Sequence, residues 1–124
     1  PLDDAAIQRI VNVFTEEGAD CKISSIHVNG WFGDFDKLRM STLMLSECFN
    51  TNVNDDDVRN TVVFVGDSPN DAPMFSFFPN AVGVANVSDF LSSIKTPPRW
   101  ITKSRGGDGF AEIAEALISA RKTS

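Results

Sequence analysis

The feature that most constrains the fold is a short apolar run, Thr61 to Val65, that leads directly into a sharp polar loop. A continuous apolar run without alternation is typical of a strand buried on both faces, as in a parallel sheet. The loop Gly66-Asp67-Ser68-Pro69-Asn70-Asp71 follows without a spacer. In open α/β sheets, ligands lie beyond the carboxyl ends of the strands. We therefore expect any ligand of this chain at that loop.

The segments on either side of this run have the lengths and patterns of alternating helices and strands. The expected elements are a helix over 36–49, the strand 61–65, a helical turn over 74–77, a strand over 81–85, a short helix over 87–94, a strand over 100–102 and a final helix from Phe110. This αβαβαβα order predicts an α/β fold with a Rossmann-like parallel sheet. Trp100 is expected in the core, and the polar segment 50–60 is expected to be a loop.

The first 33 residues have a different pattern. A helical spacing of apolar residues runs from Asp3 to Glu17, and Gly18 is expected to end that helix. Alternation over Cys21 to Val28 predicts one half-buried strand, and the glycine-containing segment 29–33 predicts a turn or a crossing between domains. We therefore divide the chain into a first unit, residues 1–33, and a second unit, residues 34–124.

Composition narrows the classes of function. The chain has 124 residues, which is enough for one domain with a core, and a net charge of −6, which argues against binding nucleic acid. No apolar run approaches the roughly 18 residues that a membrane span needs, and no signal peptide is visible. Cys21 and Cys48 lack the spacing of a metal site or a disulfide framework, which favours a reducing, cytoplasmic location. His27 is the single histidine.

The loop carries two carboxylates, Asp67 and Asp71, four residues apart. Oxygen ligands on a tight loop at a strand end suit a hard cation such as Mg²⁺. The alternative is a capped turn, in which Asp67 closes the loop and Asp71 caps the following helix. The pattern of the residues alone leaves both interpretations open.

A resemblance favours the first interpretation. Residues Val62 to Met74 resemble the fourth motif of haloacid-dehalogenase-like hydrolases, an apolar strand followed by G-D-x-x-N-D and a short helix containing Met. The segment Asn80–Asn86, and Ile101-Thr102 leading to Gly107–Phe110, are similar to the following strands in the sugar-phosphatase branch with a large cap. Together the similarity covers about residues 25–122. Lys37 lies where the family's third motif, a lysine opening the preceding helix, is expected.

The resemblance implies a role for each of these residues. Asp67 would bind Mg²⁺ directly, and Asp71 would hold a metal-bound water or orient Lys37. Lys37 would neutralise charge between the nucleophile and the phosphoryl group, while Asn70 and Ser68 would hydrogen-bond the phosphate or the metal ligands. The substrate would be a sugar phosphate or a similar small phosphorylated metabolite, hydrolysed through an aspartyl-phosphate.

The nucleophile of this family, a D-x-D at the end of an apolar strand, has no convincing match. Asp34-Phe35-Asp36 follows a glycine-rich turn and is expected to cap a helix, and Asp55-Asp56-Asp57 is expected to be a solvated turn. The second motif is also missing, because Ser24-Ser25 does not end a strand. The expectation is a C-terminal part of the enzyme, inactive alone, with the end of a cap domain in residues 1–33.

Several questions stay open at this point. The chain is expected to self-associate through an exposed sheet edge or to pair with the missing N-terminal half. His27, Asn29 and Trp31 could face substrate, although a surface histidine, a turn asparagine and a packed tryptophan are the plainer interpretations. The alternative function is a non-catalytic Rossmann-like binding or interaction domain that holds a cation or a phosphate ligand.

Overall fold

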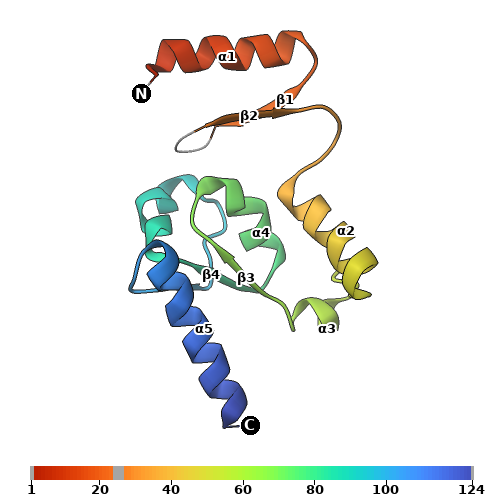
Figure 1. Cartoon of the computed structure of the whole chain (residues 1–124), viewed down its shortest axis with the longest axis vertical. Helices are drawn as coiled ribbons and strands as arrows, with labels where there is room; N and C mark the ends of the chain where they lie inside the picture. The colour runs from red at the N-terminus through yellow and green to blue at the C-terminus, as the bar shows by residue number, and fades with distance from the viewer. Residues whose placement is uncertain (1, 24–26, 124) are drawn as a thin grey trace.

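The computed structural model describes residues 2–23 and 27–123. Its elements follow in the order α1 (Asp4–Glu16), β1 (Asp20–Ile23), β2 (Val28–Trp31), α2 (Lys37–Phe49), α3 (Asp56–Arg59), β3 (Val63–Gly66), η1 (Pro69–Asp71), α4 (Ala72–Phe77), β4 (Asn80–Gly83), η2 (Ala85–Ser93), β5 (Trp100–Ile101) and α5 (Gly106–Lys122), where η marks a 3₁₀ helix. The fold is mixed α/β (Figure 1). No helix in the described ranges combines the length and apolarity needed to cross a bilayer.

The second part of the chain forms a parallel sheet, as predicted. Its three strands lie in the order β3-β4-β5, and both pairings are parallel. This topology is compatible with a Rossmann-like fold. β4 is buried on both faces, because Ala81 packs with Phe75 and Val87 on one face, while Val82 packs with Ile113 of α5 on the other. The run 61–65 is also expected to be buried on both faces, but β3 is only partly buried and Val63 is 39% exposed.

The helix α4 joins two parts of the core. Phe75 belongs to the cluster beneath η2, whereas Met74 and Phe78 pack with Val53 from the segment between α2 and α3. Phe64 of β3 contacts both parts, with its ring 5.6 Å from that of Phe75 and 6.2 Å from that of Phe78. The apolar residues of the run and of α4 therefore fix β3, and with it the start of the loop.

Side-chain hydrogen bonds fix the ends of several helices. Asp3 caps α1 by accepting from the backbone N–H of Ala6, and Asp36 caps α2 by accepting from that of Arg39, each at 2.7 Å. The expectation that Asp36 caps a helix is confirmed. Near the start of α5, Glu112 accepts from the backbone N–H groups of Lys103 and Ser104, and these hydrogen bonds lower the pKa of Glu112 below its ordinary value.

The first part of the chain differs from the prediction. The single strand expected over Cys21 to Val28 is instead two antiparallel strands, β1 and β2, and the turn expected over 29–33 is largely replaced by β2. The residues 24–26 between them, which include Ser24-Ser25, lie outside the described part of the chain. Alternation identifies a strand but carries no information on where the chain reverses. Figure 1 shows this hairpin between α1 and the rest of the molecule.

Smaller corrections concern single elements. The loop expected over 50–60 contains the short helix α3, and α5 begins at Gly106 rather than at Phe110. The short helix expected over 87–94 is a 3₁₀ helix. Trp100 was expected in the core but is 47% exposed, because β5 is a two-residue strand at the edge of the sheet.

Candidate functional site

The loop from Gly66 to Asp71 lies at the carboxyl end of β3 and is closed by one of its own side chains. Asp71 is 2% exposed. Its Oδ2 accepts hydrogen bonds from the backbone N–H groups of Asp67 at 2.8 Å and of Ser68 at 3.2 Å. The loop is thus closed by Asp71, whereas the capped-turn alternative assigned that part to Asp67. Asp71 makes no side-chain cap to α4.

Gly66 leaves the space that this carboxylate occupies. A Cβ atom on Gly66 would lie 2.7 Å from Asp71 Oδ2 and 2.8 Å from Asp71 Cγ. A Cβ atom does not approach a non-bonded atom this closely, so a side chain here would displace the carboxylate. The glycine that opens the loop is therefore part of what holds Asp71 in place.

The second oxygen of Asp71 contacts a residue far away in the sequence. Lys37 Nζ forms a hydrogen-bonded ion pair with Asp71 Oδ1, although the two residues are 34 positions apart. Lys37 is the first residue of α2, and its side chain remains 49% exposed. The ammonium group is held by a buried carboxylate and still has an open side. The structure thus brings Asp71 and Lys37 together. The resemblance implied two possible roles for Asp71, to orient Lys37 or to hold a metal-bound water.

The other loop residues have more open positions. Asp67 is exposed, and its carboxylate forms no hydrogen bond or ion pair with another residue in the described ranges. Ser68 and Asn70 are half-buried. Ser68 contributes its backbone N–H to loop closure, and Asn70 lines a cavity together with Lys37. The site therefore offers one free carboxylate, one partly open ammonium and one amide.

A divalent cation fits this donor set only in part. Residues 2–23 and 27–123 contain no group of three or more His, Cys, Asp and Glu side chains able to hold a metal. Both oxygens of Asp71 are already engaged, which leaves Asp67 as the free carboxylate of the loop. Mg²⁺ commonly binds proteins through one or two carboxylates and completes its coordination with waters and substrate phosphate. The residues present fit such a site, with further oxygen donors from elsewhere.

The cavity beside Lys37 also includes residues that sequence reasoning missed. It has a volume of about 440 Å³ and is lined by Asp20, Cys21, Lys22, Asn29, Trp31, Asp36, Lys37 and Asn70. The sequence analysis names Asn29 and Trp31 as residues that could face substrate, but not Asp20 and Lys22. Each pair consists of residues two positions apart, and alternate residues of a strand share one face. This spacing could have placed Asp20 and Lys22 on one face. His27 is exposed and is not among the lining residues.

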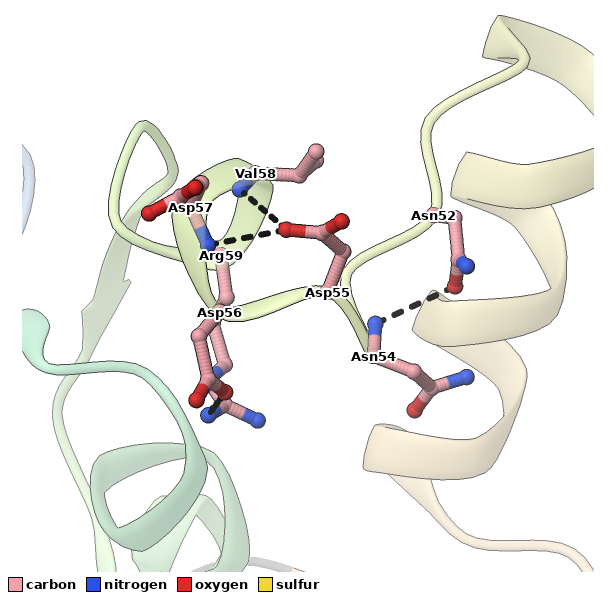
Figure 2. A network of polar contacts seen from close by, with 7 residues as sticks. All are labelled: Asn52, Asn54, Asp55, Asp56, Asp57, Val58 and Arg59. Atoms are coloured by element: carbon pink, nitrogen blue, oxygen red, sulfur yellow. Dashed lines mark hydrogen bonds and ion pairs between the residues drawn. The ribbon is translucent and has the colours of Figure 1, made fainter.

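The two other acidic clusters have local structural roles. Figure 2 shows Asp55 accepting from the backbone N–H groups of Asp57 and Val58 at the start of α3, while Asp56 pairs with Arg59. In the cluster 34–36, Asp34 pairs with Arg39 and Asp36 caps α2. Each of these five contacts joins residues at most five positions apart. Neither cluster follows a strand of the parallel sheet.

Comparison with known proteins gives one partial similarity to a phosphatase. Over 61 residues the chain is 39% identical to a phosphoglycolate phosphatase of Methanothrix thermoacetophila, an alignment that covers 48% of this chain and 25% of that protein. The matched part of this chain thus spans about a quarter of the length of the curated relative. No family model and no solved structure matches the chain.

Proposed function

We propose that this chain carries the metal-binding and lysine-bearing part of a Mg²⁺-dependent phosphoric-monoester hydrolase of the haloacid-dehalogenase-like superfamily, in its large-cap branch. Residues 34–124 are the C-terminal part of the catalytic core, and residues 1–33 are the end of the cap. The observation that carries the proposal is the ion pair between Lys37 and the buried Asp71 beside the free carboxylate of Asp67, at the carboxyl end of β3. The partial similarity to a phosphatase supports it.

In this function the residues of the loop bind and neutralise a phosphate group. Asp71 holds the Lys37 ammonium in one position, so that its charge is available to the phosphoryl oxygens without reorganisation. Asp67 presents its oxygens to Mg²⁺, and the half-buried Ser68 and Asn70 donate hydrogen bonds to the phosphate. The bound cation shields phosphate charge from an attacking carboxylate. The substrate is a small phosphorylated metabolite, such as a sugar phosphate or the phosphoglycolate in the relative's name.

The attacking carboxylate, which forms the aspartyl-phosphate, comes from outside this chain. β3 pairs with β4 alone in the described part of the sheet, so its other edge presents unpaired backbone groups. We propose that this edge receives the strand that carries the nucleophile. A parallel strand there would end beside the loop, since the carboxyl ends of parallel strands meet at one edge of a sheet.

Association measurements test this pairing. In analytical ultracentrifugation, the chain mixed with a polypeptide that supplies a D-x-D segment should form a one-to-one complex. The chain alone should self-associate weakly through the same edge. A stable homodimer that does not bind the added segment would instead show that this edge pairs with a second copy of the chain.

The unpaired Cys21 and Cys48 are compatible with a reducing, cytoplasmic location.

The decisive test is Mg²⁺-dependent hydrolysis of an aryl phosphate. This chain alone should give no turnover, and the complex with a D-x-D segment should be active. Asp67→Asn and Lys37→Met should each lower the activity of that complex by at least about a hundredfold. Asp57→Asn is the matched control, because Asp57 lies in the exposed cluster of α3.

Two other outcomes would change the assignment. Turnover by this chain alone would show that one of the carboxylates at 34–36 or 55–57 is a nucleophile after all. An inactive complex that still binds Mg²⁺ and phosphate at the loop would favour the non-catalytic binding domain.

A further inference from the structure

The hairpin of β1 and β2 has two faces with different surroundings. In its register Asp20 lies opposite Trp31 and Lys22 opposite Asn29, whereas Cys21 lies opposite Gly30. Residues opposite each other in an antiparallel pair point to the same face, and neighbours along a strand point to opposite faces. One face therefore carries Asp20, Lys22, Asn29 and Trp31, and the other carries Cys21 and Gly30.

The face with Gly30 is covered by α1. A Cβ atom on Gly30 would lie 2.3 Å from a ring atom of Phe14, so the helix packs directly on the backbone of β2. A side chain at this position would have to displace the Phe14 ring, so glycine allows the ring to lie against the strand. The polar face therefore points away from α1.

This polar face and the Lys37 end of the core line the same cavity. All four residues of the face line the cavity of about 440 Å³, together with Lys37, Asn70, the helix-capping Asp36 and Cys21, the strand residue between Asp20 and Lys22. Figure 1 shows the hairpin between α1 and the remainder of the molecule, as this arrangement requires. A phosphate held beside Lys37 would thus have its organic part between the loop and the hairpin.

The chemistry of the face is mostly that of hydrogen-bond donors. Lys22 is exposed and forms no ion pair with any residue in the described ranges, and the Asn29 amide lies opposite it. The indole N–H of Trp31 is shielded from solvent and has no hydrogen-bond partner among the described residues, which is costly for a donor. Asp20 adds one carboxylate two residues from Lys22, about 7 Å away along the strand. An anion is therefore favoured at the Lys22 and Asn29 end.

We propose that the hairpin selects phosphate monoesters whose organic part carries a carboxylate, with Lys22 as the ion-pairing residue and Asn29 as a hydrogen-bond donor. This inference rests on the proposed phosphatase function and assigns the specificity of the same site to residues outside the motif. Lys37 neutralises the phosphate, and Lys22 neutralises the second negative group at the opposite wall of the cavity.

The test compares two esters that differ in the carboxylate. The chain is titrated in the presence of Mg²⁺ with 2-phosphoglycolate and with ethyl phosphate, and the amide ¹H–¹⁵N shifts of Gly66, Asp67, Ser68, Asn70 and Asp71 report binding. 2-Phosphoglycolate, the phosphate ester that carries a carboxylate, should bind about three- to fivefold more tightly than ethyl phosphate, as expected for one exposed ion pair. Lys22→Gln should remove that preference without changing the affinity for ethyl phosphate. Lys22→Arg should keep it.

The control variant is Lys95→Gln, which removes the same charge from an exposed position outside the cavity and should keep the preference. Equal affinities for the two esters, or a preference that survives Lys22→Gln, would overturn the inference and leave the phosphate site intact. If neither ester perturbs the loop, the proposed function itself is contradicted, and the inference falls with it.

Discussion

The loop Gly66–Asp71 and the segment Asn52–Arg59 both concentrate carboxylates, yet they use them in opposite ways. In the first, the Asp71 side chain is 3% exposed and contacts Lys37 from another helix. In the second, the Asp56 side chain is 80% exposed, and the contacts drawn in Figure 2 span at most three residues. A high density of aspartates therefore does not identify a site in this chain. Burial and a partner far away in the sequence do.

The difference has an energetic consequence. A buried carboxylate is stable only if its charge and its lone pairs are matched, so removing any partner leaves an uncompensated group. An exposed carboxylate keeps its hydration and depends little on its neighbours. Substitutions in the two segments should therefore have effects of different size.

The largest effect is expected for Asp71→Ala. The substitution removes the acceptor of the Asp67 and Ser68 backbone N–H groups and the partner of Lys37. Urea denaturation should show a loss of about 3 kcal/mol in the free energy of unfolding. Asp57→Ala, in the exposed segment, should change it by less than about 0.5 kcal/mol. Equal losses for the two variants would remove the distinction between the segments.

The next effect tests how the loop accommodates that carboxylate. Gly66→Ala should destabilise the chain by about 2 kcal/mol, because the new Cβ atom overlaps the position of the Asp71 carboxylate. Gly107→Ala is the matched control, since a Cβ atom there meets nothing within 4 Å and alanine favours a helix. Thermal unfolding of both variants measures the difference. A harmless Gly66→Ala would mean that the close approach is not required.

A smaller effect is expected in the exposed segment. Asp55→Ala removes the cap of α3 and should cost about 1 kcal/mol in the free energy of unfolding. Asp55→Asn should restore most of this stability, since asparagine caps a helix as well as aspartate does. Neither variant should alter Mg²⁺ binding, measured by calorimetry. Loss of Mg²⁺ binding in either variant would show that the structure of the exposed segment affects the loop Gly66–Asp71.

The smallest effect is expected for Asp56→Ala. The pair with Arg59 is three residues apart on the surface, and Arg59 also stacks on Phe77 at 4.7 Å from the ring centroid. The free energy of unfolding should change by no more than about 0.5 kcal/mol in urea. A change above about 1 kcal/mol would show that the exposed segment depends on its ion pairs as the loop does.

Much of the parallel sheet could be predicted from the sequence. The run before Gly66 and the run around Val82 are apolar without alternation, which is typical of parallel strands, and both form such strands. Burial on both faces holds for β4 but not for β3, where Val63 is 39% exposed. The hairpin could not be predicted, because the alternation over Cys21 to Val28 is the same in one strand and in two. Trp100 was placed wrongly, since its hydrophobicity does not indicate that β5 is a short edge strand.

For the candidate site, the sequence by itself determined that Asp67 and Asp71 share one loop at the end of an apolar strand. That result follows from local rules of strand patterning and turn formation. Only the tertiary structure decided which carboxylate turns inward, because the choice depends on the space above Gly66 and on Lys37 arriving from another helix. Only the tertiary structure turned the Lys22 face of the hairpin toward Lys37, since the packing of α1 on Gly30 selects the face that it covers. Contacts between distant segments depend on shape as well as residue type, and no local pattern carries them.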